Sequence, residues 1–184
     1  MTLLRISAVL LAGALAAGCA STSTSVKSVT PAQLADAGRG TILVSTAAAQ
    51  RCASTGSWAP IYDAATHKLA AGTPVLPIDE HPDSDYPDHY GTLSAVSLPP
   101  GRYLMTVEAA NPGVEDIEVP AFAFEVVAGH ARYLGTLTRT TRCGTLARFS
   151  VIDNYDVDVM LAAQRNPALR DLAPERALLT FVRR

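Results

Sequence analysis

Short alternations of apolar and polar residues, separated by turns rich in proline and glycine, run from residue 92 to residue 152 and constrain the fold of this chain most strongly. Within residues 102–110, Tyr103, Met105 and Val107 share one face, and polar residues share the other. Turns are predicted at residues 99–101 and 111–113, where proline presets the backbone and glycine accepts a positive φ. This pattern predicts half-buried strands joined by tight turns.

The other segments that read as strands share β-branched or aromatic residues and neighbouring turn signals. Further inward-facing residues are expected on three of them: Phe122, Phe124 and Val126; Tyr133 and Leu137; and Phe149 and Val151. We therefore predict a mainly β fold, an antiparallel Ig-like or transthyretin-like β-sandwich of about seven strands. The predicted strands cover residues 41–45, 58–62, 73–78, 92–98, 102–110, 121–127, 131–138 and 145–152.

The periodicity changes after residue 152 and predicts a C-terminal helix over about residues 153–166. Asp153 or Asn154 can cap this helix, and Pro167 ends it. The side expected to face the domain carries Val157, Met160, Leu161 and Gln164. Residues 174–182 are compatible with a short helix or with a closing strand, and residues 31–37 with one helical turn.

Three motifs in the second half of the chain resemble a known series of proteins. They are LPPGRY at residues 98–103, FEVVAG at 124–129 and YLG at 133–135. They resemble small, uncharacterised bacterial lipoproteins that have transthyretin-like or carboxypeptidase-regulatory-like β-sandwiches. Residues 153–169, which end in NPAL, are similar to the helical tail of those proteins. The resemblance covers residues 92–170, implies a sandwich of the cell envelope and transfers no functional residue.

The first residues predict export and lipidation. A basic start at Arg5 precedes an apolar run at residues 6–15, and small residues lead into Cys19. Residues 15–19 resemble the lipobox of a bacterial lipoprotein signal peptide. The resemblance implies cleavage before Cys19, a diglyceride on its thiol and a further acyl chain such as palmitate on the new amine. Since Ala20 rather than an aspartate follows, the outer membrane is the favoured location.

Two other interpretations of this segment are a secretory signal cut without lipidation and an uncleaved anchor. The apolar run is shorter than the roughly 20 residues that a helix needs to cross a bilayer, which argues against an anchor. We divide the chain into a signal peptide (1–18), a lipidated cysteine with a flexible Ser/Thr-rich tether (19–37) and one domain (38–184). The formal net charge is −2 without a long run of one sign, so nucleic acid is not an expected partner.

The chain contains three cysteines. Once Cys19 carries lipid, Cys52 and Cys143 remain as a pair in an oxidising compartment, and a disulfide between them is predicted. It would close a loop of about 90 residues and contribute on the order of 4 kcal/mol through loop-closure entropy. The alternatives are two inert buried thiols or half of a metal site.

Residues 79–90 (DEHPDSDYPDHY) form the densest polar cluster and are a candidate metal site. Carboxylates suit calcium, and histidine combined with aspartate suits zinc. Pro87 interrupts the spacing of a calcium loop, and Ser94 stands where a bidentate glutamate would be needed. The alternative is a hydrated surface loop. The candidate ligands are His81, Asp83, Asp85, Asp88 and His89.

Arginine is concentrated in a stretch without carboxylates between Glu125 and Asp153. Paired strands could gather these arginines on one face that suits an anionic ligand. The alternative is that this face pairs with the acidic loop at residues 79–88 of the same molecule. The arginines concerned are Arg132, Arg139, Arg142 and Arg148.

Common catalytic motifs such as G-x-S-x-G, S-x-x-K and H-E-x-x-H do not occur in the sequence. We therefore predict a lipid-anchored, non-catalytic accessory or binding module that recognises an envelope protein or glycan and needs no cofactor. One alternative is a metal-dependent or glycan-directed envelope enzyme that uses residues 79–90. The other is a structural interaction protein that docks through a sheet edge.

Overall fold

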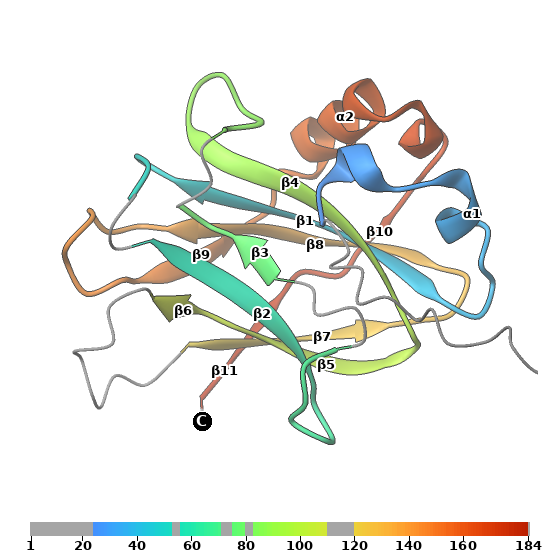
Figure 1. Ribbon diagram of the computed structural model, residues 1–184, viewed down its shortest axis with the longest axis horizontal. Coiled ribbons are helices and arrows are strands. Elements are labelled where there is room, and N and C mark those ends of the chain that lie inside the picture. Colours follow the sequence, from blue (N-terminus) through green and yellow to red (C-terminus); the bar gives the residue numbers. More distant parts are fainter. Residues whose placement is uncertain (1–23, 53–55, 71–74, 80–82, 110–119, 184) are drawn as a thin grey trace, which may run out of the picture.

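The computed structural model describes residues 24–52, 56–70, 75–79, 83–109 and 120–183. These residues form a two-layer β-sandwich with one longer helix on its outer face, as Figure 1 shows, and this confirms the predicted fold class. In this part of the chain, no helix is long and apolar enough to cross a membrane.

The first layer, sheet A, has the strand order β10-β8-β1-β4, and β9 pairs with β8 beside β10. β4 and β9 run antiparallel to their neighbours, whereas β1 and β10 pair with β8 in parallel. Sheet A is therefore mixed, and the prediction of an antiparallel sandwich is wrong for this layer, because strands distant in the sequence pair here. Its strands are β1 (Gly40–Ala48), β4 (Tyr90–Leu98), β8 (Ala131–Arg139), β9 (Phe149–Ile152) and β10 (Glu175–Arg176).

The second layer, sheet C, is antiparallel and has the order β11-β7-β5-β2-β3, with β6 also paired to β2. Its strands are β2 (Ser57–Asp63), β3 (Val75–Pro77), β5 (Gly101–Thr106), β6 (Glu108–Ala109), β7 (Ala121–Val126) and β11 (Thr180–Val182). The Pro-Pro-Gly turn carries the chain from β4 in sheet A to β5 in sheet C, where the Tyr103 hydroxyl donates a hydrogen bond to the Pro99 carbonyl at 2.9 Å. β4 and β5 follow each other in the chain but thus lie in different sheets.

The core between the layers is apolar and contains most of the side chains predicted to face inward. Phe149 and Val151 pack against it as partly buried residues, also as predicted. Its fully buried members include Ile42, Val44, Ile61, Leu76, Leu98, Met105, Leu134 and Leu137, and the predicted Tyr103, Val107, Phe122, Phe124 and Val126 are buried there too.

The prediction that Tyr133 and Leu137 share a face is wrong. Leu137 points into the core between the sheets, whereas Tyr133 packs in a second apolar cluster. The cause is a bulge: the register between β1 and β8 shifts between Leu43 and Ser45, and Gly135 adopts a φ of 91° beside the shift. One extra residue in a strand reverses the faces of all residues beyond it.

Helix α2 (Tyr155–Arg165) lies on the outer face of sheet A, where the sequence predicts a helix, but on the side lined by the four predicted residues only Leu161 packs against the domain. Val157 is 51% exposed and Met160 is 56% exposed. The helix instead buries Asp158 and Ala162, which are 1% and 2% exposed. A short 3₁₀-helix, η2 (Pro167–Leu169), follows it.

The N-terminal segment differs from the predicted flexible tether over residues 19–37. From Thr24 onward it is folded onto the domain through the 3₁₀-helix η1 (Val26–Ser28) and helix α1 (Pro31–Leu34). The Ala95 N–H donates to the Thr24 carbonyl at 2.9 Å, and Val26 is fully buried. Helix α1 is the predicted helical turn, capped by Thr30 and Gln33 in a reciprocal capping box.

The C-terminal segment closes the sandwich. Residues 174–182, for which the sequence allowed a short helix or a closing strand, contain two strands. β10 pairs with β8 in sheet A, and β11 pairs with β7 in sheet C. Between them the Leu179 N–H donates to the Leu134 carbonyl at 2.9 Å, and the Leu179 side chain enters the core. The segment therefore joins the two layers along one edge.

Candidate functional site

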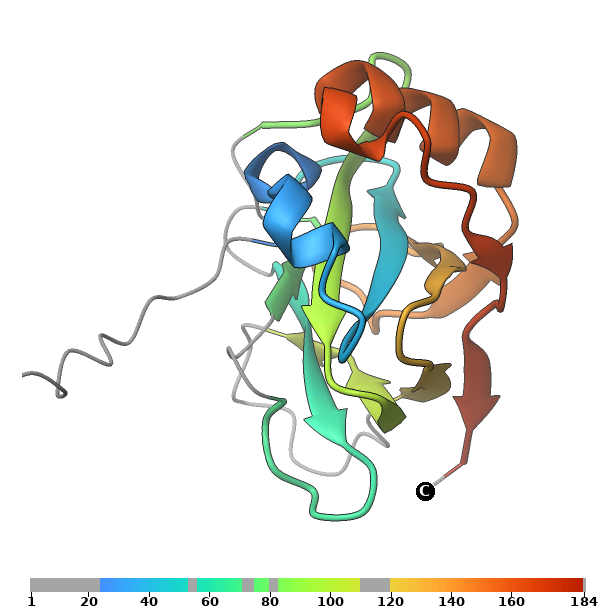
Figure 2. The same cartoon turned by 90° about the vertical axis from the view of Figure 1, so that its right-hand side faces the viewer.

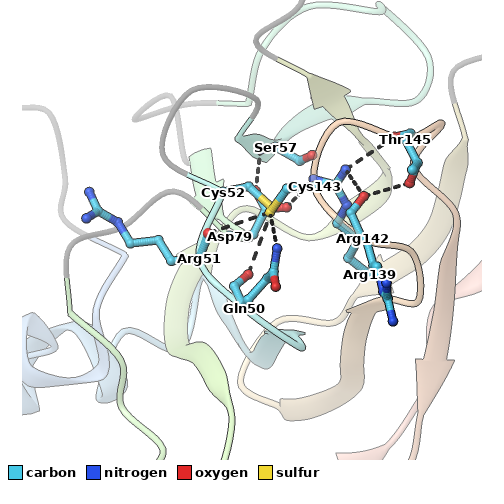
Figure 3. Close-up of a disulfide and its surroundings, with 9 residues drawn as sticks. All are labelled: Gln50, Arg51, Cys52, Ser57, Asp79, Arg139, Arg142, Cys143 and Thr145. Carbon is cyan, nitrogen blue, oxygen red and sulfur yellow. Dashed lines mark hydrogen bonds and ion pairs between the residues drawn. A yellow bond between two sulfur atoms is a disulfide. The ribbon is translucent and has the colours of Figure 1, made fainter.

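A disulfide joins Cys52 to Cys143 at one end of the sandwich and confirms the predicted pairing. The Cα atoms are 5.5 Å apart, and 91 positions of sequence separate the two residues. The bond connects the residues that follow β1 to the loop at residues 140–148 between β8 and β9, as Figure 3 shows. Cys19 lies outside the described residues.

A buried ion pair lies beside this disulfide. Arg139 Nη1 donates to Asp79 Oδ2 at 2.5 Å, and both side chains are almost completely buried. Asp79 Oδ1 also accepts from the Ser57 N–H at 2.5 Å. Arg139 Nη2 reaches the carbonyls of Arg142 and Thr145 at 3.2 and 3.4 Å (Figure 3). The ion pair and the disulfide therefore hold the same loop, 140–148, against the body of the sandwich.

The four arginines proposed as an anionic-ligand face do not gather on one surface. Arg139 points inward to Asp79, which is the alternative of pairing with the acidic segment of the same molecule. Arg132, at the other end of β8, pairs with Glu125 at 3.2 Å and Glu175 at 3.7 Å. Only Arg142 and Arg148 are exposed, both in the loop at residues 140–148.

The acidic segment contributes to packing through several of its candidate ligands. Asp85 accepts from the Leu93 N–H at 3.0 Å and pairs with Lys27 at 3.6 Å and with Arg165 at 4.0 Å. Asp88 bonds the neighbouring His89 at 2.8 Å, and this contact lowers the pKa of Asp88.

Within the described residues, no three histidine, cysteine or acidic side chains are arranged to hold a metal ion. Asp83 is described and lies at the surface, whereas His81 lies outside the described residues. The described members of this segment are therefore oriented by contacts within the protein, and binding of a metal with the help of His81 stays a prediction.

A second buried polar centre, which the sequence did not predict, surrounds Asp158 under helix α2. The Tyr86 hydroxyl donates to Asp158 Oδ1 at 2.6 Å. The Tyr133 hydroxyl and the Ser45 hydroxyl donate to Oδ2 at 2.8 and 2.5 Å. Thr136 completes the set, because its hydroxyl donates to Oδ2 at 3.3 Å and lies 2.8 Å from the Ser45 hydroxyl. We call Asp158 and these four hydroxyl side chains the Asp158 centre.

Neutral hydroxyl donors surround the side chain of Asp158. Asp158 lies in the first turn of α2, where the helix dipole stabilises negative charge. Burial, together with the charge of Asp158, raises the pKa of Tyr86 and of Tyr133 well above the ordinary value, so both phenols stay protonated and remain donors. The centre fixes α2 to sheet A, and Asp158 is buried within it.

A third set of contacts fixes the N-terminal segment to the same helix. Asn166, at the end of α2, donates through Nδ2 to the carbonyls of Val26 and Val29, both at 2.8 Å. Val26 packs with Leu43 and Leu93 in the second apolar cluster, the one that contains Tyr133. Burying such a side chain stabilises the fold by roughly 1.5–3 kcal/mol. Residues 24–29 are therefore an integral part of the domain.

The hydrophobic pattern could not reveal the Asp158 centre, because an aspartate in a helix is normally placed on the solvent side. The weak signal in the sequence is the combination of Tyr155, Asp158 and Ala162 at helical spacing, which defines the face that α2 buries.

Comparison with protein-family models, with curated protein sequences and with solved structures finds no match to this chain. The resemblance to lipoproteins with transthyretin-like sandwiches therefore stays an expectation drawn from the turn and strand motifs. The function has to be inferred from the residues themselves.

Proposed function

We propose that this protein is a lipid-anchored component of the cell envelope and that its β-sandwich is a non-catalytic accessory or binding module. The observation that carries the proposal is the disulfide between Cys52 and Cys143. Such bonds persist in oxidising compartments and are rare in the cytosol. The disulfide uses two of the three cysteines and leaves Cys19, which ends the predicted signal peptide, for the lipid.

The use of the buried polar residues supports a non-catalytic role. Arg139 and Asp79 satisfy each other and the backbone of neighbouring loops. Asp158 is surrounded by hydroxyl groups from β1, β8 and the segment before β4. Both centres are closed to solvent, and both connect elements of the fold, which is the role of a buried structural network.

The anchor is tested by purifying the full chain from membranes and measuring the mass of its N-terminal peptide. We expect a peptide that begins at Cys19 and carries acyl chains, together with recovery of the protein in the outer-membrane fraction. A Cys19→Ser variant should leave the membrane fraction while keeping the disulfide. An unmodified Cys19 in the mature protein would refute the anchor.

A second candidate, docking through a sheet edge, is favoured by strand β11. In the part of the chain that the structure describes, β11 ends sheet C and pairs on one side only, with β7. Phe181 on this strand is 54% exposed although its ring contacts Phe122, and Leu178 and Ile152 are also exposed. An edge strand with exposed apolar side chains suits the addition of a strand from another protein.

Edge docking is tested by Thr180→Pro, which removes a backbone donor from β11, with Thr180→Val, which keeps that donor, as the matched control. If partner strands add to β11, the first variant should lose association with membrane partners while it keeps the far-UV spectrum of the wild type. Association that survives Thr180→Pro would exclude this edge.

The competing metal-dependent enzyme predicts stabilisation by calcium or zinc. A thermal shift on adding either ion, reversed by a chelator, would favour it over the binding module. We expect no such shift.

A further inference from the structure

The folded domain begins very close to the lipidation site. Cys19 is five residues before Thr24, whose carbonyl already accepts a hydrogen bond from Ala95 on β4. Ser25 forms a bridge with Ser94 on the same strand. The connection between lipid and domain is therefore far shorter than the tether over residues 19–37 that the composition predicts.

Covalent geometry sets an upper limit on how far the domain can be from the membrane. Five residues span at most about 18 Å, whatever their conformation. The polar layer on each side of a bilayer is about 5–8 Å thick, so Thr24 can be no more than about 10–13 Å outside it. A domain of about 150 residues is roughly 38 Å across. Most of the domain cannot come between Thr24 and the bilayer.

The place where Thr24 joins the domain defines one edge of the sandwich. β4 ends sheet A, and β3 ends sheet C on the same side, because Thr46 and Thr92 donate to the carbonyl of Pro77 at 2.8 and 3.1 Å. We call β4, β3 and η1 the anchor edge. The opposite edge, which we call the far edge, contains β9, β10 and β11. Figure 2 shows the blue helices η1 and α1 on one side and β11, in dark red beside the C-terminus, on the other.

The attachment at the anchor edge is rigid enough to transmit an orientation. Val26 is fully buried, and Asn166 holds the carbonyls of Val26 and Val29. The domain is therefore expected to move with residues 24–29 as one unit.

We propose that the anchor edge lies against the bilayer surface in the lipidated protein, so that the far edge is directed away from the membrane. This inference rests on the proposed lipidation of Cys19. Strands in a sheet are about 4.8 Å apart, so the four steps from β3 to β11 place β11 about 19 Å further from the bilayer than β3. The exposed Ile152, Leu178 and Phe181 are thereby presented to partners in the periplasmic space.

The orientation is tested with single thiol labels on the lipidated full chain, reconstituted into phosphatidylcholine vesicles that contain a headgroup-attached quencher. With Cys19 acylated and Cys52 bonded to Cys143, Lys27→Cys or Thr180→Cys supplies the free thiol for a fluorophore. Both positions are exposed, one beside Thr24 and the other on β11. Since the reach from Cys19 is at most about 18 Å, we expect at least about threefold stronger quenching at position 27 than at position 180.

A matched control carries about 20 Gly and Ser residues inserted between Ser23 and Thr24, which extends the average reach to about 25 Å. The difference between the two labels should then largely disappear. Equal quenching without the insertion, or a difference that survives it, would overturn the inference.

The mass of the N-terminal peptide separates the two proposals. An acylated Cys19 with equal quenching would refute only the orientation. A Cys19 without acyl chains would refute the proposed anchor, and the orientation with it.

Discussion

Asp158→Asn should destabilise the fold strongly although the two side chains have nearly the same shape. The carboxylate accepts three short hydrogen bonds from hydroxyls, at 2.5, 2.6 and 2.8 Å, and a longer one from Thr136 at 3.3 Å. Charge-assisted hydrogen bonds are roughly twice as strong as neutral ones, so neutralising the acceptor costs about 1 kcal/mol for each short bond. The amide also places donors opposite hydroxyl groups. We therefore expect the free energy of unfolding to fall by about 3 kcal/mol.

The change in the free energy of unfolding is measured by urea unfolding of the full domain. It is obtained from the shift of the midpoint, provided that the dependence on urea concentration stays the same. Asp156→Asn is the matched control, because its side chain is 92% exposed and its contact with Arg176 is 3.5 Å long. This control should change stability by less than about 0.5 kcal/mol. A loss below about 1 kcal/mol for Asp158→Asn would refute the role of the Asp158 centre as the link between α2 and sheet A.

Three further outcomes follow from the buried contacts. Because the pKa values of Tyr86 and Tyr133 are raised in the folded protein, their contribution to stability is complete below pH of about 10 and falls at higher pH by about 1.4 kcal/mol per pH unit for each phenol. Urea unfolding at several pH values in this range should show that the free energy of unfolding falls less steeply with pH in Tyr86→Phe. An unchanged dependence on pH would count against the raised pKa of Tyr86. Arg139→Met should lower the free energy of unfolding by about 3–5 kcal/mol, because it leaves the charge of Asp79 buried without its partner. Arg148→Met should leave the free energy of unfolding nearly unchanged in the same assay. Reduction of the disulfide should lower the free energy of unfolding by about 4 kcal/mol, and an equal midpoint for oxidised and reduced protein would contradict its role in stability.

Local patterns in the sequence were sufficient for the fold class. Alternation within residues 102–110 and 121–127 correctly placed Tyr103, Met105 and Phe122 in the core, because side chains on a strand alternate strictly between two faces. The disulfide was predictable because only two cysteines remain after Cys19 is set aside.

The errors occur where a single residue or a distant partner overrides the local pattern. The bulge at Gly135 places Tyr133 and Leu137 on opposite faces of β8. A single glycine in a predicted strand is not enough to predict a bulge. Helix α2 exposes Val157 and Met160 because it turns Asp158 toward the hydroxyl groups of Ser45 and Tyr133. These two residues lie on strands of sheet A, far from the helix in the sequence. Within the helix, only the spacing of Tyr155, Asp158 and Ala162 points to the buried face.

The boundary of the tether was wrong for a similar reason. A run of serine and threonine is typical of solvated linkers, but the same residues can cap helices and pair with an edge strand. Thr30 caps α1, and Ser25 bridges to Ser94. Val26 is buried against Leu43 and Leu93, and its carbonyl is bonded by Asn166, 140 residues later in the chain, so its place could not be predicted from the segment alone.

The most direct test of the central claim, that this anchored sandwich recognises another envelope component, is in-cell photo-crosslinking of the full lipidated chain followed by mass spectrometry. A photoreactive amino acid replaces Phe181 on the far edge and, in a second strain, Lys27 on the anchor edge. We predict one reproducible envelope protein or glycan attached through position 181 and lipid attached through position 27. A chain that gives no reproducible attachment at position 181 would contradict the proposed binding module.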